Sequence, residues 1–478
     1  MSIGDTDFGV QVGIGFLGRV ATALVALVGS IFLARILGPA GYGGFYLIMA
    51  VVKFLDNPVT GWSSACRKRL TETDFPSDEA LGSLALAVVV GSAAITGVAF
   101  ASRGQIASLT GLTDAWMLVS VLFFGVVVYG TGLEMLKATA NFGAATWTIA
   151  LRDIIRVSIQ AVLVVIGLGI AGMVGGMVAA NLLLMPVLVY LIGTKPSVPG
   201  RETLASIWTF AKSSIPNGVV SSAQDRMDVL LLGVLATQSV VGNYEVALRL
   251  TTPAIFLSGV AGGGLLGRIS NRRSRNESVR DDIRNNISYS SVIAVPVFFG
   301  ALVVGGPVVV TLYSEQYSQA GTLIAGLALY HLFVSQKDIH VAVLAGFDRP
   351  ELNLRVSVAV FVLNIVLGIG LFMLFGPVGI VAATVVSAGL GYTVRAYLVR
   401  RLVPNLSVLP RPLIEQVACG AVMAGAVLSV REALTFGGWE HVALAVATGI
   451  VVYWTVLLTI SEPLRKTALA VARDADLR

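Results

Sequence analysis

Two arginines lie four residues apart inside a run of apolar residues. Arg152 and Arg156 interrupt the hydrophobic stretch 145–168. In a helix this spacing places both side chains on one face, and burying such a charge in a membrane costs about 2.5–3.5 kcal/mol. Guanidinium groups bind phosphate and carboxylate oxygens through two hydrogen bonds at once. The pair therefore predicts a site that holds an anion within a membrane.

Acidic residues nearby do not balance this charge. Asp153 points about 100° away from Arg152 around a helix, so we expect that it cannot neutralise both arginines. When the ends of the segments are left aside, four basic residues stand against two acidic ones in the first half, whereas the second half is balanced. The basic residues of the first half are Arg19, Lys53, Arg152 and Arg156, and the acidic ones are Asp56 and Asp153. Such an excess indicates a watery cavity that receives something negative.

Two further groups of charges lie in the middle of apolar segments. Lys53 and Asp56 are three residues apart, which lets them pair on one helix face. The sequence 221–228, SSAQDRMD, is too polar to face lipid. Asp225 and Asp228 share a face there, and Arg226 points away from it. We expect this stretch to line a cavity or a packed interface.

The elements that position these residues are membrane-spanning helices. Of 478 residues, 56% are hydrophobic and only 13% are charged, whereas soluble domains carry about 25% charged residues. Fourteen apolar segments are each long enough to cross a bilayer. Their approximate bounds are 12–34, 42–65, 80–101, 114–136, 145–168, 171–193, 212–236, 240–266, 286–312, 319–345, 353–375, 376–399, 412–433 and 441–462. The chain is therefore predicted to be an all-α polytopic membrane protein.

The distribution of Lys and Arg over the loops predicts the orientation. The termini and the loops after even-numbered segments carry 22 of them, and the opposite loops carry three, Arg35, Arg103 and Arg431. Because positive loops stay in the cytoplasm, both termini are expected to be cytoplasmic. The first apolar run lacks a basic leader and a cleavage site, so we interpret it as a retained helix.

An internal repeat predicts two similar halves. The turn at 32–46, rich in Gly and Pro, joins the first two segments, and a fainter copy at 232–244 joins segments 7 and 8. Segments 1 and 7 run in the same direction, which gives two parallel six-helix repeats. The predicted domains are an N-terminal lobe at 1–193, a cytoplasmic linker at 194–211, a C-terminal lobe at 212–400, and helices 13 and 14 with a cytoplasmic tail at 401–478.

The motifs of common enzymes and cofactor sites are absent from the sequence. It contains no GxxxxGK[ST] phosphate loop and no HExxH motif, and it has only three histidines. Cys66 and Cys419 lack the spacing of a metal or redox site. We expect no catalytic residue, no metal and no cofactor. Transport would then be driven by an ion gradient, the membrane potential or the gradient of the substrate.

Two motifs and the 6+6+2 organisation carry a resemblance that extends over nearly the whole chain. The motifs are ARILGPAGYGGFYLIMAV and DRMDVLLLGVLATQSVVGNYEVALRL. The chain resembles the polysaccharide and oligosaccharide flippases of the multidrug/oligosaccharidyl-lipid/polysaccharide exporter superfamily. The resemblance implies two six-helix bundles around a central cavity, open alternately to each side. It also implies a glycan carried on a polyprenyl or dolichyl phosphate, moved outward across the cell membrane for surface polysaccharide or glycoprotein assembly.

This resemblance gives the charged residues expected roles. Arg19, Arg152, Arg156 and Arg226 would hold the anionic headgroup, Lys53 and Asp56 would tune that site, and Asp225 and Asp228 would couple transport to Na⁺ or H⁺. The expected partners are the lipid-linked glycan and membrane lipids, with no nucleic acid, and a monomer is plausible. The alternatives are a cation-coupled multidrug antiporter, a lipid II-type flippase and, ranked below them, a membrane-embedded glycosyltransferase.

Overall fold

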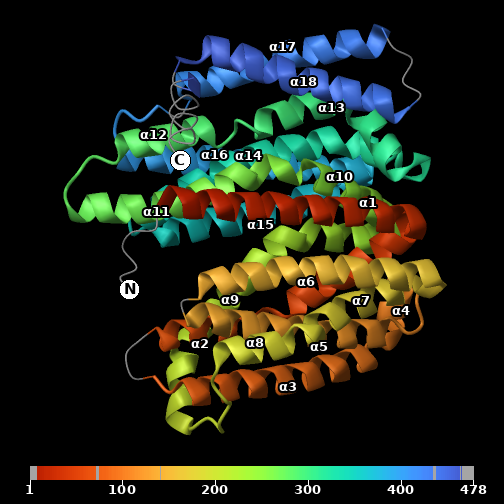
Figure 1. The fold of residues 1–478 in the computed structure, drawn as a ribbon, viewed down its shortest axis with the longest axis vertical. Helices are drawn as coiled ribbons and strands as arrows, with labels where there is room; N and C mark the ends of the chain where they lie inside the picture. The colour runs from red at the N-terminus through yellow and green to blue at the C-terminus, as the bar shows by residue number, and fades with distance from the viewer. Residues whose placement is uncertain are drawn as a thin grey trace. The chain divides into compact units, whose positions relative to one another are not determined.

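The computed structural model describes residues 8–71, 75–139, 141–407, 409–433, 438–462 and 464–465. Within these ranges it describes the side chains except those of residues 8–21, 23, 109, 142, 217 and 260. Every regular element in the described ranges is a helix (Figure 1), so the predicted all-α class is confirmed. The chain divides into two compact units, Met1–Gly242 and Asn243–Arg478.

The first unit is built from nine α-helices and the start of a tenth within the described residues. They are α1 (Phe8–Leu55), α2 (Asn57–Leu70), α3 (Ser77–Ala101), α4 (Arg103–Thr110), α5 (Ala115–Ala138), α6 (Phe142–Leu163), α7 (Gly169–Leu183), α8 (Met185–Ile192) and α9 (Arg201–Leu235). A π-helical turn, η1 (Val164–Leu168), joins α6 to α7. Helix α10 (Gln238–Thr251) contains the boundary between the units.

The second unit continues with eight further α-helices in the described ranges. They are α11 (Phe256–Ser274), α12 (Arg280–Tyr289), α13 (Ala294–Tyr313), α14 (Ala320–Gly346), α15 (Pro350–Phe375), α16 (Pro377–Leu402), α17 (Arg411–Ala433) and α18 (Trp439–Ile460). Short 3-10 turns, η2 (Thr252–Ile255) and η3 (Glu315–Tyr317), lie beside α10 and α13. Helix α14 packs against α11, α13 and α16, which makes it the central helix of this unit.

The turns predicted from Gly and Pro are present. Helix α1 is broken at Gly38, whose φ is 64° and ψ is 173°, so its two parts form the predicted helix–turn–helix. Gly376, with φ of 60°, separates α15 from α16 directly before Pro377. Glycine adopts a positive φ without the steric cost of a Cβ, and proline begins the following helix because its missing N–H needs no partner there.

The sequence repeat is also a spatial contact within the first unit. A Cβ added to Gly43, in the turn, would lie 1.9 Å from the carbonyl oxygen of Gln238 and 2.5 Å from the backbone nitrogen of Gly242. A Cβ on Gly242, in the fainter copy, would lie 2.1 Å from the carbonyl oxygen of Pro39. The 199-residue offset thus pairs two glycines that let the two backbones touch directly.

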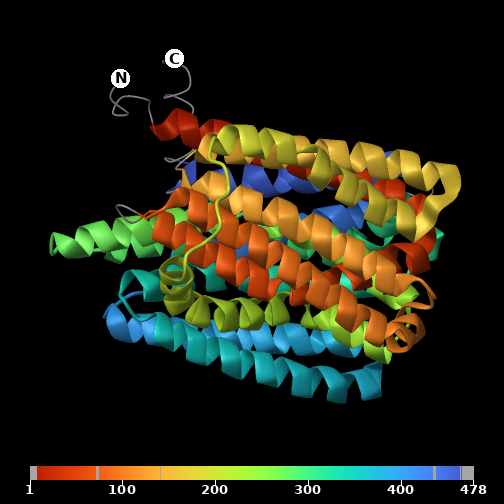
Figure 2. The same ribbon diagram turned by 90° about the horizontal axis from the view of Figure 1, so that it is seen from below.

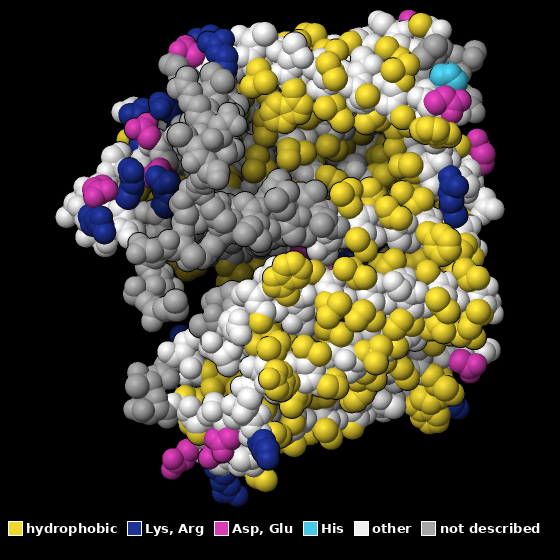
Figure 3. Space-filling model, in the orientation of Figure 1, with side chains coloured by type: hydrophobic (Ala, Val, Ile, Leu, Met, Phe, Trp, Pro, Cys, Tyr) yellow, Lys and Arg dark blue, Asp and Glu magenta, His cyan; other side chains and the backbone are white. Residues whose placement is uncertain are grey.

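Apolar surfaces identify a multi-pass membrane protein. Ten segments among the described residues are long and apolar enough to cross a membrane. Four of them, Leu24–Leu55, Gly143–Ile192, Gln238–Ser274 and Arg280–Tyr313, run over more than one helix. The long helices of each unit run in nearly the same direction (Figure 2). On the visible face, hydrophobic side chains cover these helices and charged side chains gather at their ends (Figure 3). The count of fourteen spans stays a prediction.

Helix α9 packs against α2 and α1 in the first unit. Glu79, at the start of α3, accepts hydrogen bonds from the Gly200 backbone N–H, at 2.7 Å, and from the Thr203 hydroxyl at the N-terminus of α9. A carboxylate there satisfies backbone donors that have no partner inside the helix. The predicted domain boundaries around the linker at 194–211 stay a prediction.

Candidate functional site

Helix α6 presents the two arginines toward neighbouring helices of the first unit. Its exposed side chains, among them Trp147, Leu151 and Ile154, recur at helical spacing on one side. Arg152 and Arg156 lie off that side, with side chains 21% and 18% exposed. Helices α1, α5 and α7 pack against α6. The arginines are thus mostly enclosed by protein but keep about a fifth of their side-chain surface accessible.

Asp153 contacts both arginines through a single oxygen. Its Oδ1 accepts a hydrogen bond from Nη2 of Arg152 at 2.7 Å and one from Nε of Arg156 at 3.4 Å. The expectation that Asp153 would not serve both was therefore wrong in geometry, because the long arginine side chains bend back to it. The expectation that Asp153 cannot neutralise the charge of both arginines is met, because one carboxylate offsets only one of two guanidinium groups. The cluster keeps an excess positive charge.

Gln160 holds Arg156 in place from the next turn of α6. Its Oε1 accepts a hydrogen bond from Nη1 of Arg156 at 3.3 Å, and its Nε2 donates to the Met173 carbonyl of α7 at 2.7 Å. Gln160 is fully buried, and a Cβ on Gly176 of α7 would approach its Cγ to 2.6 Å. Close packing of α6 on α7 therefore fixes the amide, and the amide fixes the guanidinium.

Two polar atoms beside the arginines lack partners among the described residues. Tyr129 of α5 is 2% exposed, and its ring centroid lies 5.0 Å from the guanidinium carbon of Arg152. Its hydroxyl is buried without a hydrogen bond, as is the Nε of Arg152. Burying such groups unsatisfied costs about 1–3 kcal/mol each. A cation–π contact and two unused donors at one place fit a site that accepts an anion.

Lys53 and Asp56 pair with each other at a bend between α1 and α2. Lys53 Nζ lies 2.9 Å from Asp56 Oδ2, and Asp56 is 5% exposed. At the same bend, Pro58 cannot donate to the Phe54 carbonyl, and Asn57 Nδ2 donates to that oxygen instead at 2.8 Å. Among the described residues, no hydrogen bond or ion pair joins this pair to Arg152 or Arg156.

The remaining predicted site residues lie on α1 and α9. Arg19 lies in the first part of α1, outside the described side chains. Asp225, Arg226 and Asp228 all lie on α9, where Asp225 is exposed and the other two are half-buried. Each of these three has an interaction partner. Asn57 connects α2 to α9, because Ser222 Oγ donates to its Oδ1 at 2.9 Å.

The second unit contains polar residues in structural settings. His331 is 4% exposed, and its Nδ1 lies 2.9 Å from Thr251 Oγ1. Arg395 is one of the 22 basic residues assigned above to loops and termini, although it falls at the end of the segment 376–399. It lies inside α16 and is 3% exposed. Its Nε donates to Asn353 and its Nη2 to Ser357 of α15. Hydropathy gave no signal for this burial, because Arg395 lies near the basic end of the segment.

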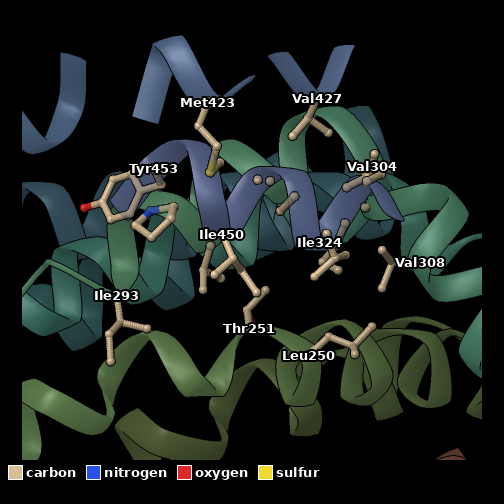
Figure 4. A pocket seen from close by; sticks show the side chains of 18 of the residues that line it. Leu250, Thr251, Ile293, Val304, Val308, Ile324, Met423, Val427, Ile450 and Tyr453 are labelled. Carbon is tan, nitrogen blue, oxygen red and sulfur yellow. The ribbon is translucent and has the colours of Figure 1, made fainter. Parts of the chain in front are cut away.

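A cavity within the second unit is apolar. It has a volume of about 370 Å³ and is lined by side chains of α10, α13, α14, α17 and α18 (Figure 4). Two of its polar groups are bonded to the backbone, since Tyr453 donates to the Val292 carbonyl at 3.0 Å and Thr251 donates to backbone oxygens of α10. No charged side chain lines it. This cavity suits hydrocarbon and not an anionic group.

Among the described residues, no group of three or more His, Cys, Asp and Glu could hold a metal ion.

Residues 32–322 match the model of a family described as polysaccharide biosynthesis protein. Two curated proteins of Haloferax volcanii are similar over almost their whole length. The probable flippase AglR is 26% identical over 96% of both chains, and the probable low-salt glycan biosynthesis flippase Agl15 is 23% identical over 95% of this chain and 96% of its own.

Solved structures share the fold. The lipid II flippase MurJ in an inward closed conformation matches with a TM-score of 0.76 at 14% identity, over 94% of this chain and 99% of its own. An inward-facing multidrug resistance MATE family transporter of the MOP superfamily matches with a TM-score of 0.61 at 16% identity, over 82% of this chain and 100% of its own.

Proposed function

Because this chain belongs to the polysaccharide biosynthesis protein family, we propose that it is a flippase for a lipid-linked sugar or oligosaccharide. The glycan is carried on a polyprenyl or dolichyl phosphate and moves from the cytoplasmic to the outer leaflet of the cell membrane by alternating access. Full-length relatives named as flippases support this proposal. The protein is a transporter and not an enzyme.

The cluster of Arg152, Asp153 and Arg156 is the observation that carries the proposal. It places two guanidinium groups and one carboxylate on a membrane helix, each of them partly exposed. A phosphate bound to a lipid meets this need for an anion, because its oxygens accept from a guanidinium fork in bidentate geometry. The excess positive charge of this cluster needs an anionic partner, because an unpaired positive charge inside a membrane is costly.

The orientation and the other roles complete the proposal. Both termini lie in the cytoplasm, and the two six-helix lobes at 1–193 and 212–400 alternate around the substrate, with helices 13 and 14 appended. Arg19 and Arg226 join the headgroup site, Lys53 and Asp56 tune it, and Asp225 and Asp228 couple it to Na⁺ or H⁺.

The test measures on which leaflet the glycolipid accumulates. In cells whose own protein is replaced by the double variant Arg152→Ala and Arg156→Ala, we expect the carrier to accumulate on the cytoplasmic face. Each arginine contributes charge-assisted hydrogen bonds of about 1.5–3 kcal/mol, so losing both lowers headgroup affinity by about a hundredfold or more. Leaflet accessibility of the glycolipid to a membrane-impermeant oxidant or lectin reports this. Arg103→Ala, which removes an exposed positive charge elsewhere, is the matched control. An unchanged distribution in the double variant contradicts the proposal.

A cation-coupled multidrug antiporter is the second candidate, favoured by the two acids on α9. Export of a cationic dye that survives the double arginine variant but is lost in Asp225→Asn or Asp228→Asn would favour the antiporter. Flipping that depends on the arginines, with no dye export, favours the flippase.

A further inference from the structure

Asp153 occupies the place that an incoming anion needs. Both guanidinium groups direct a donor to the same oxygen, Oδ1, at 2.7 and 3.4 Å. The carboxylate is 13% exposed and contacts both arginines through this one oxygen. A phosphate oxygen that binds both arginines therefore meets a negative charge already seated between them.

Gln160 and Tyr129 contact the arginines independently of Asp153. Arg156 is held through Gln160, which is itself fixed to the Met173 carbonyl at 2.7 Å, so its guanidinium does not depend on Asp153 alone for its position. Arg152 lies against the Tyr129 ring and keeps its Nε without an acceptor among the described residues. The buried Tyr129 hydroxyl beside it is likewise unsatisfied there. These donors belong to a site that Asp153 fills only in part.

We propose that Asp153 is a positioning residue that weakens the grip of Arg152 and Arg156 on the phosphate headgroup, so that the headgroup is released after crossing. This inference rests on the proposed function. The carboxylate holds the two guanidinium groups together against their mutual repulsion, and it subtracts one charge from the two they carry. A transporter needs such a compromise, since its ligand must enter readily and also leave.

The role of Asp153 can be tested by comparing the binding of two ligands that differ in negative charge. Removing the Asp153 charge while keeping its shape strengthens attraction for every negative charge on the ligand. The gain is therefore larger for a prenyl diphosphate than for a prenyl phosphate that carries less charge. A merely structural role would weaken the binding of both probes, because the arginines would lose their positions.

We would measure binding of short-chain prenyl phosphate and prenyl diphosphate to the purified full-length protein in detergent. For Asp153→Asn we expect about tenfold tighter binding of the diphosphate, a smaller gain for the monophosphate and a steeper salt dependence. Competition by inorganic pyrophosphate tells whether the headgroup alone suffices or the lipid is needed. In proteoliposomes the same variant should flip glycolipid more slowly despite its tighter binding.

Two further variants control the experiment. Asp153→Glu keeps the charge and should reverse most of the gain in affinity that Asp153→Asn shows. Glu134→Gln removes a carboxylate from the separate cluster with Arg67 and Lys137 and should leave binding unchanged. Weaker or equal diphosphate binding by Asp153→Asn, in a protein that melts normally, overturns the inference. If Arg152→Ala binds the diphosphate as well as the unmodified protein does, the headgroup site of the proposed function fails instead.

Discussion

At the scale of single residues, Asn57 stabilises the bend at Pro58 by replacing a hydrogen bond that proline cannot make. In a regular helix the N–H of residue 58 would donate to the carbonyl of Phe54. Asn57 Nδ2 takes that acceptor at 2.8 Å, and its Oδ1 receives the hydroxyl of Ser222 from α9. A side chain of one helix thus satisfies a backbone group and fixes the neighbouring helix.

This arrangement predicts that Asn57→Leu lowers the free energy of unfolding by about 1–3 kcal/mol, because the Phe54 carbonyl loses its donor inside the protein. The melting temperature in detergent measures the change. Adding Pro58→Ala should recover part of the loss, since alanine restores a backbone N–H at that position. Ser222→Ala, which removes only the contact to Oδ1, should cost less. Equal melting of Asn57→Leu and the unmodified protein would show that the bond does not stabilise the bend.

At the scale of elements, two glycine-rich turns hold α1 and α10 in backbone contact within the first unit. Gly43 and Gly242 correspond in the sequence repeat, and each faces backbone atoms of the other turn. Gln238 strengthens the junction by donating to the Thr110 carbonyl at the end of α4. Because the nearest atoms are backbone, they cannot move aside as a flexible side chain would.

We therefore expect Gly43→Ala to destabilise the protein by about 1–3 kcal/mol, the usual cost of overpacking. Gly242→Ala should act in the same direction. Gly97→Ala, at a helical glycine with nothing within 4 Å of an added Cβ, is the matched control and should leave the melting temperature unchanged or slightly raised. Equal melting of all three variants would mean that the turns separate readily.

At the scale of the whole molecule, the surface is arranged for lipid. In the most apolar stretch of helix α15, only 6% of the residues are buried. Met373, Leu374 and Phe375 at the end of this helix are largely exposed. In water such a patch would favour aggregation, whereas in a bilayer it meets hydrocarbon.

The predicted orientation can be tested with single cysteines. Both native cysteines, Cys66 and Cys419, are buried and would first be replaced by serine. In intact cells, a membrane-impermeant thiol reagent should label Arg103→Cys and should label Arg275→Cys only after the membrane is opened. Both positions are exposed. Labelling of Arg275→Cys in intact cells would invert the orientation or change the number of spans before it.

The sequence by itself determined the membrane class, the helical architecture, the turns at Gly38 and Gly376, and the pairing of Arg152 with Arg156 on one face. These features depend on hydropathy and on the 3.6-residue period of a helix, which act over neighbouring residues. The resemblance to lipid-linked glycan flippases also came from local motifs, the glycine-rich turn and its copy.

Only the tertiary structure decided that Asp153 serves both arginines, that Gln160 fixes Arg156 through α7, and that Tyr129 lies beside Arg152. It also buried Arg395 between α15 and α16 and brought the two copies of the turn into contact. These facts depend on side-chain rotamers and on which helices become neighbours. Helical period sets the direction in which a side chain leaves its helix, but packing against residues distant in sequence decides where its end lies.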